Sequence, residues 1–105
     1  MRDVYTIGLQ YIVIIADQKQ KKKLLNLLYD YDTKCVDIIY GRGSMSPSAI
    51  AAAFGFDTEQ GKVVISGLLP NEKAKNLMET LINDYSFGKP NTGIAYTVSV
   101  EGIAF

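Results

Sequence analysis

The stretch KVVISGLLPNEKAKNLMETLINDYSFGKPNTGIAYTVSV, Lys62–Val100, decides the fold because it reads as strand, helix and strand. The β-branched residues of Lys62–Leu68 predict one strand, and those of Ile94–Val100 predict another. Between them we expect Asn71 to cap a helix and Gly88 to end it. The apolar residues of this helix recur at steps of three and four, the spacing of an amphipathic helix: Ala74, Leu77, Met78, Leu81, Ile82 and Tyr85.

The preceding part of the chain has the same order of elements. Leu9–Ala16 (LQYIVIIA) is nearly unbroken in apolar character, which suits a strand covered on both faces, although a buried helix also fits so short a run. Asp17 is expected to cap a helix from about Gln18 to Tyr29, with Gln20 as its capping-box partner. Cys35–Tyr40 then predicts a second strand, in which Cys35 would be a small buried residue.

The order βαββαβ predicts a ferredoxin-like α+β fold, in which an antiparallel sheet carries two helices on one face. At 105 residues the chain is expected to form a single domain, 1–105. Between the second and third strands, Ser46 and Pro47 indicate the start of a short helix through Phe54. The seven tyrosines are expected to lie mainly in the core or at an interface.

In this topology, three connections meet at one end of the sheet: those after the first strand, after the second strand and after the second helix. That end would gather basic residues, whereas Asp30, Asp32 and Glu72 would lie toward the other. A solvated helix end is the simpler interpretation of the lysine run, and attraction of an anion is the alternative. The basic residues concerned are Lys19, Lys21, Lys22, Lys23, Arg42 and Lys89.

Two broader patterns narrow the class of protein. Lys+Arg and Asp+Glu both number 11, so no overall charge favours nucleic acid or a membrane surface. The longest apolar run, Tyr11–Ala16, is too short to span a bilayer, and we expect a cytoplasmic protein. The runs IVII and VVI place apolar residues on both sides of their strands. An exposed apolar sheet face usually marks an interface, so we expect an oligomer.

Two segments of the chain resemble the nitrogen-regulatory PII superfamily. They are Gly41-Arg42-Gly43-Ser44 after the second strand and Lys89-Pro90-Asn91-Thr92-Gly93-Ile94-Ala95 before the last predicted strand. The similarity covers about Leu9–Glu101 and is greater to PII-like members that carry a short helical insert, here within 45–61, in place of a long mobile loop.

This resemblance implies a homotrimer that binds a small-molecule effector, typically an adenine nucleotide, in clefts between subunits and regulates a partner protein. Glycines let backbone N–H groups approach phosphate closely, and Arg42 would bind phosphate in a bidentate manner. Ile94 replaces a PII lysine and the basic pair beyond the last strand is absent, which favours a ligand smaller or less charged than ATP. The ligand-binding residues implied are Gly41, Arg42, Gly43, Ser44, Gly88, Lys89, Asn91, Thr92 and Gly93.

Three other functions compete with a nucleotide sensor. A trimeric interaction module could keep the fold without a ligand, and an amino-acid-sensing ACT-like domain shares the order of elements. An enzyme is disfavoured because the chain has no histidine and a single cysteine, and no serine with an evident base beside it.

Gly93 could equally serve only to shape the turn into its strand. The sequence does not identify the ligand or the regulated protein.

Overall fold

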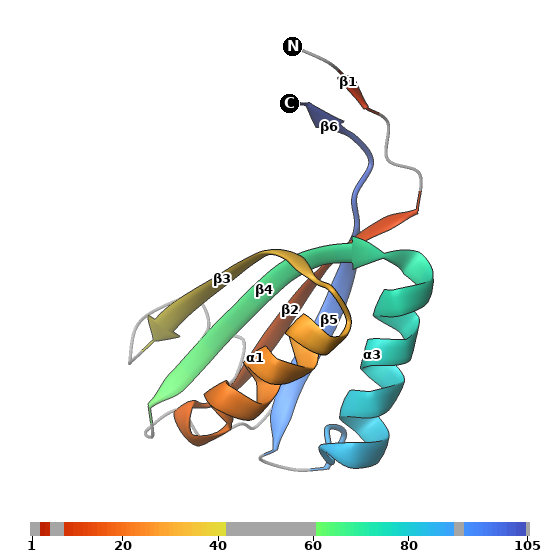
Figure 1. Cartoon of the computed structure of the whole chain (residues 1–105). Coiled ribbons are helices and arrows are strands. Elements are labelled where there is room, and N and C mark those ends of the chain that lie inside the picture. The colour runs from red at the N-terminus through yellow and green to blue at the C-terminus, as the bar shows by residue number, and fades with distance from the viewer. Residues whose placement is uncertain (1–2, 5–7, 42–60, 90–91, 105) are drawn as a thin grey trace.

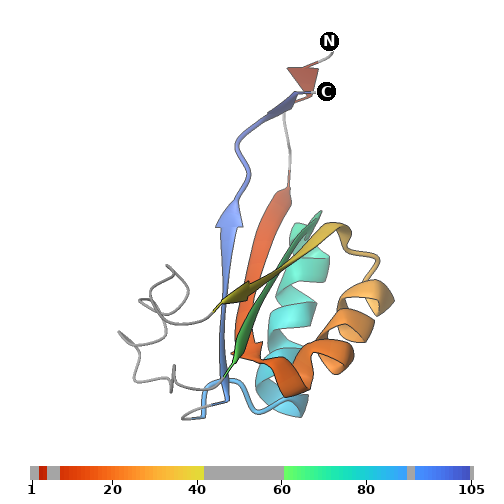
Figure 2. The same ribbon diagram turned by 90° about the vertical axis from the view of Figure 1, so that its left-hand side faces the viewer.

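The computed structural model describes residues 3–4, 8–41, 61–89 and 92–104. Four strands form an antiparallel sheet in the order β3-β4-β2-β5. Figures 1 and 2 show α1 and α3 side by side on one face of this sheet. The ferredoxin-like fold predicted from the sequence is therefore confirmed. The elements are β2 (Leu9–Asp17), the 3-10 helix η1 (Gln18–Gln20), α1 (Lys21–Asp30), β3 (Lys34–Gly41), β4 (Lys62–Pro70), α3 (Asn71–Asp84) and β5 (Gly93–Ser99).

Alternate residues of the central strands form the core against the helices. Ile14 of β2 lies opposite Ile65 of β4, and both are fully buried. Burial of such side chains stabilises the fold by about 1.5–3 kcal/mol each. The short helix predicted at 48–54 lies outside the described residues. Other members of this core cluster are Ile12, Ala16, Leu24, Leu27, Leu28, Val63, Leu69, Ala74, Leu77, Leu81 and Phe87.

A second, two-stranded ladder lies apart from the main sheet. β1 (Asp3–Val4) pairs with β6 (Ile103–Ala104) in antiparallel fashion, at the end of the molecule away from the start of β5 (Figure 1). Within the described parts of the chain, no helix is long and apolar enough to cross a membrane.

Helix α3 begins and ends differently from the sequence prediction. Pro70 is its N-cap residue, and Asn71, the predicted cap, is the first helical residue. The Asn71 side chain instead accepts a hydrogen bond from Gln10 Nε2 of β2 at 2.8 Å. The helix stops at Asp84 rather than at Gly88, because the chain turns at Ser86, whose φ is +62°.

Cys35 is also more exposed than predicted, whereas the tyrosines divide between the margin of the core and the surface. The register of β3 against β4 shifts between Lys34 and Asp37, and Cys35 within this bulge has a φ of +53°. A bulge re-aims side chains, and Cys35 is exposed, so the expectation of a buried cysteine is wrong. Tyr31 and Tyr85 are half-buried and pack against the core cluster, as predicted, whereas Tyr11, Tyr29, Tyr40 and Tyr96 are exposed.

The sheet face away from the helices is apolar, as predicted. Tyr11 pairs with Val98, and Val13 with Tyr96, in the β2–β5 ladder, on the opposite face from Ile12 and Ile14. Tyr11, Tyr96 and Val98 are 40%, 37% and 51% exposed, and Ile39 of β3 is 47% exposed. We call these residues the open-face patch: Tyr11, Ile39, Tyr96 and Val98.

The ion pairs of Asp32 make the stability of the fold depend on pH in the acid range. Lys34 Nζ donates a hydrogen bond to Asp32 Oδ1 at 2.8 Å and, with Lys73 Nζ 3.9 Å from Oδ2, holds the pKa of Asp32 below its ordinary value of 3.8. A lowered pKa means that Asp32 stabilises the fold above pH 3.8, and that this contribution is lost as the pH falls through the lowered value. The melting temperature of the unmodified protein should therefore fall as the pH drops below 3.8. In Asp32→Asn this fall should be smaller, as measured by circular dichroism at a series of pH values. Asn also tolerates the φ of +57° found there, so an unchanged acid profile would contradict this assignment.

Candidate anion site at the loop edge of the sheet

The strand ends that carry the predicted ligand loops lie at one edge of the sheet. Gly41, the last residue of β3, pairs with Lys62 of β4, which also pairs with Asp17 of β2. Gly93, the first residue of β5, pairs with Ala16 of β2. We call this end of the sheet the loop edge, defined by Asp17, Gly41, Lys62 and Gly93. The predicted meeting of connections at one end is thus confirmed for the described residues.

A buried cation lies at the loop edge. Lys62 is only 4% exposed, and its Nζ lies 3.9 Å from Asp17 Oδ2. Asp17 Oδ1 accepts a hydrogen bond from the backbone N–H of Lys19 at 3.0 Å, which is the N-cap predicted from the sequence. Lysine is almost never fully buried unless it is paired. The sequence reasoning missed Lys62 because the first position of an apolar strand carries no signal of burial.

One lysine of the predicted basic cluster is engaged within the chain. Lys21 Nζ donates to Tyr40 Oη at 2.7 Å, and the same nitrogen lies 5.2 Å from the centre of the Tyr40 ring. Lys21 therefore ties the start of α1 to the end of β3, immediately before Gly41. Asp32 lies at the other end of the sheet, as predicted, but Lys34 and Lys73 lie beside it, so that end is not purely acidic.

The turn after α3 has the backbone conformation that glycine favours. Gly88 has a φ of +101°, a conformation that side chains rarely adopt, and a Cβ there would have open space around it. The N–H of Lys89 donates to the Ser86 carbonyl at 3.1 Å, and that of Phe87 to the Leu81 carbonyl at 2.9 Å. Lys89 itself is exposed, so its charge is accessible at this edge.

Two contacts fix the far end of the same loop. Gln20 Nε2 donates to the Thr92 carbonyl at 3.1 Å, so its side chain reaches the loop rather than acting as the capping-box partner predicted for Asp17. The Phe87 ring packs against Gly93, and a Cβ on Gly93 would lie 2.4 Å from Phe87 Cζ. Only glycine fits at this position, which gives Gly93 a structural role whether or not it binds a ligand.

The structure thus brings together some of the predicted ligand residues. Gly41, Thr92 and Gly93 lie at the loop edge, and Gly88 and Lys89 belong to the turn that leads to it. Across the sheet, Gly41 and Gly93 are separated by β4 and β2, or three strand spacings of about 4.8 Å, roughly 14 Å in all. Within the described part of the chain, no group of His, Cys, Asp and Glu could hold a metal ion. Arg42, Gly43, Ser44 and Asn91 lie outside the described residues.

Sheet order, helix placement and the glycine-bounded loop edge define the split βαββαβ class, and comparison with solved structures places the chain within it. The chain has the fold of the PII-like proteins. It superposes on a protein from Thermus thermophilus, described as a PII-like signalling protein, with a TM-score of 0.66 and 22% identity over 98% of this chain and 91% of the other. No family model matches the sequence, and no curated protein matches it.

A second PII-like protein provides two further matches. CPII from Thiomonas intermedia, a nitrogen regulatory PII-like protein, matches in its apo form with a TM-score of 0.71 and 17% identity over 98% of this chain and 100% of the other. A structure of CPII bound to ADP, AMP and acetate matches with a TM-score of 0.67 and 18% identity, covering 98% of this chain and 90% of the other. Identities at this level show a shared fold.

Proposed function

We propose that this protein is a PII-like signalling protein that binds a small anionic metabolite at the loop edge, and that an adenine nucleotide is the first candidate. The main support is the convergence of Gly41, Gly93 and the buried Lys62 at one edge of the sheet. Glycine-bounded loops offer backbone N–H groups to phosphate oxygens, and Lys62 and Lys89 supply positive charge beside them. The nucleotide is suggested by CPII, whose structure has been solved with ADP and AMP bound.

The open-face patch supports a homotrimer as the working form. A sheet face that exposes Tyr11, Ile39, Tyr96 and Val98 is suited to burial against other copies of the chain. In such an assembly the Gly41 loop of one subunit would face the Gly93 loop of the next, so that a ligand need not span the sheet of a single chain. The segment 45–61 would then report the bound ligand to a regulated protein, and the protein would act by binding rather than by catalysis.

The proposal is tested by adding ATP, ADP, AMP and cyclic AMP to the purified protein and measuring its melting temperature and binding heat. A ligand at about one hundred times its Kd adds roughly 2.7 kcal/mol of stability. For a domain of this size we expect a rise of several degrees, largest for ADP or AMP. A Lys62→Met variant should lose most of this rise, whereas the exposed Lys73→Met variant should keep it.

A melting temperature that none of the four nucleotides changes would favour the alternative, a trimeric interaction module without a ligand. The same fold and open-face patch suit such a module equally well. Analytical ultracentrifugation tests the trimer itself. A monomer at micromolar concentration would contradict both the nucleotide-binding protein and the trimeric interaction module.

A further inference from the structure

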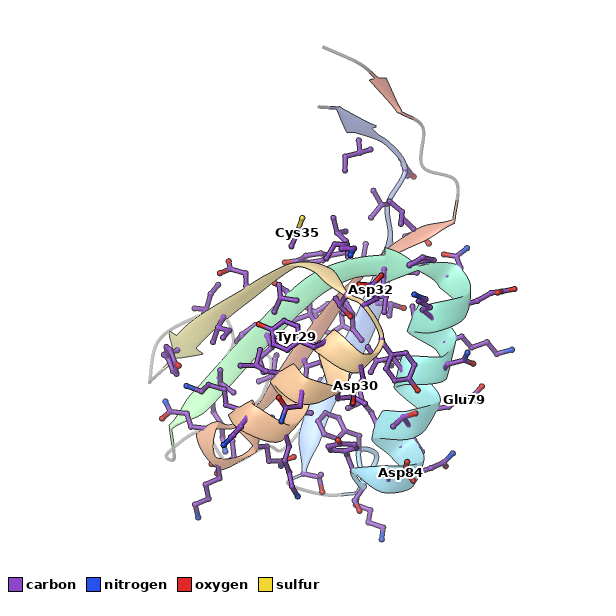
Figure 3. All side chains as sticks on the ribbon, viewed as in Figure 1. Tyr29, Asp30, Asp32, Cys35, Glu79 and Asp84 are labelled. Atoms are coloured by element: carbon purple, nitrogen blue, oxygen red, sulfur yellow. The ribbon has the colours of Figure 1, made fainter. Side chains whose placement is uncertain are left out.

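A groove between the two helices has no role in the proposed nucleotide site. It lies on the helix-covered side of the sheet and has a volume of about 630 Å³. Its walls come from the start of α1 and from the end of α3 with the turn that follows. Figure 3 shows Asp84 at the end of α3. The lining residues used below are Gln20, Lys23, Leu27, Asp84, Tyr85 and Ser86.

The two walls of this groove carry opposite charge. Helix α1 begins with three lysines and has no acidic residue in its first turn, and the nearby carboxylate of Asp17 caps the preceding 3-10 helix. Helix α3 ends at Asp84 and has no basic residue in its last turn, so its negative end is not compensated within the helix. The helices run in opposite directions (Figure 1), and Lys23 near the start of α1 and Asp84 at the end of α3 line the same groove.

The charges that face the groove are not neutralised by each other. Lys23 and Asp84 are both exposed, and no ion pair joins either of them to a side chain in the described parts of the protein. Between them, the groove floor includes Leu27, which is 7% exposed, and the half-buried Tyr85. The groove thus combines a positive wall, a negative wall and an apolar floor.

We propose that this groove binds a free α-amino acid in its zwitterionic form. Lys23 and the N-terminal end of α1 would hold the carboxylate, while Asp84 and the last carbonyl groups of α3 would hold the ammonium group. The amino-acid side chain would pack on Leu27 and Tyr85. A simple anion would meet Asp84, and a simple cation would meet Lys23, so a ligand that carries both charges fits this groove best.

The polar wall of the site is already ordered. The Gln20 side chain is held by its hydrogen bond to the Thr92 carbonyl at 3.1 Å, and the backbone of Ser86 is held by the turn in which its carbonyl accepts from Lys89 N–H at 3.1 Å. Side chains that are held in place before binding lose less entropy when a ligand arrives. The groove uses neither the open-face patch nor Gly41, but Gln20 and Ser86 join it to the Gly88–Gly93 loop through Thr92 and Lys89.

Isothermal titration calorimetry with each proteinogenic amino acid, in the absence of nucleotide, tests the proposal on the full chain. We expect at least one amino acid to bind with a Kd of about 1 mM or tighter. Its N-acetyl and amide derivatives, each of which lacks one charge of the zwitterion, should bind at least about tenfold more weakly. Lys23→Gln and Asp84→Asn should each weaken binding by a similar factor.

Two matched variants control for general effects of charge. Lys22→Gln removes a neighbouring exposed lysine that does not line the groove, and Glu72→Gln removes a carboxylate at the opposite end of α3. Both should bind the amino acid as the unmodified protein does. The proposal would be overturned if no amino acid bound at about 10 mM, ten times the expected Kd. Binding that survives both Lys23→Gln and Asp84→Asn would also overturn it.

Discussion

Gly93→Ala is expected to destabilise the fold by about 1–3 kcal/mol, because the new Cβ would lie 2.4 Å from Cζ of Phe87 in the core. Phe87 is 5% exposed and belongs to the core cluster, so its ring has little room to move away. At about 4–8 °C per kcal/mol for a domain of this size, the melting temperature should fall by several degrees or more.

Two further variants make this prediction specific. Gly102→Ala places a Cβ where nothing lies within 4 Å, so it should melt close to the unmodified protein. Phe87→Leu combined with Gly93→Ala should lose less stability than the sum of the single changes, because the smaller side chain relieves the overlap. If Gly93→Ala melts like Gly102→Ala, the packing of Phe87 on Gly93 is not what fixes the loop.

Arg42→Ala has the largest effect that we expect on ligand binding. Loss of a charge-assisted hydrogen bond to phosphate removes about 1.5–3 kcal/mol, or roughly tenfold to more than a hundredfold in Kd. Arg42→Lys keeps the charge but loses the bidentate geometry, so it should bind with intermediate affinity. Calorimetric titration with ADP measures both variants.

Lys19→Ala is the matched control, since it removes an exposed cation of the basic cluster that belongs to neither glycine-rich segment. It should bind ADP like the unmodified protein. Equal affinities for Arg42→Ala and Lys19→Ala would mean that the GRGS turn does not contact the ligand.

The sequence predicted the fold well because the βαββαβ order is encoded locally. The apolar spacing from Ala74 to Tyr85 indicates which face of α3 is buried, although Ile82 is 56% exposed, and the β-branched runs mark β2 and β4 as strands. Asp17 as a helix cap is likewise a local pattern, and the structure confirms it.

The features that the sequence did not reveal depend on contacts between distant residues. Cys35 looked like a buried strand residue, but the bulge against β4 turns it outward. Asn71 has the chemistry of a cap, yet Gln10 of β2 engages its side chain. Lys62 becomes buried only when β4 is paired on both sides, and Gly93 is required only because Phe87 packs against it.

The candidate site likewise has features that the sequence reveals and features that it does not. The glycines that bound the two loops are visible in the sequence, and their meeting at one edge follows from the topology. The role of each loop residue in binding stays a prediction, because Arg42, Gly43, Ser44 and Asn91 lie outside the described residues. In the proposed trimer, the ligand contacts would also come from more than one copy of the chain.

A crystal structure of the protein grown with ADP tests the central claim most directly. Our account predicts three copies packed through Tyr11, Ile39, Tyr96 and Val98, with the phosphates of ADP between the Gly41–Ser44 turn of one copy and the Gly88–Gly93 loop of its neighbour. ADP bound away from the loop edge, or a monomer with the open-face patch in solvent, would contradict it.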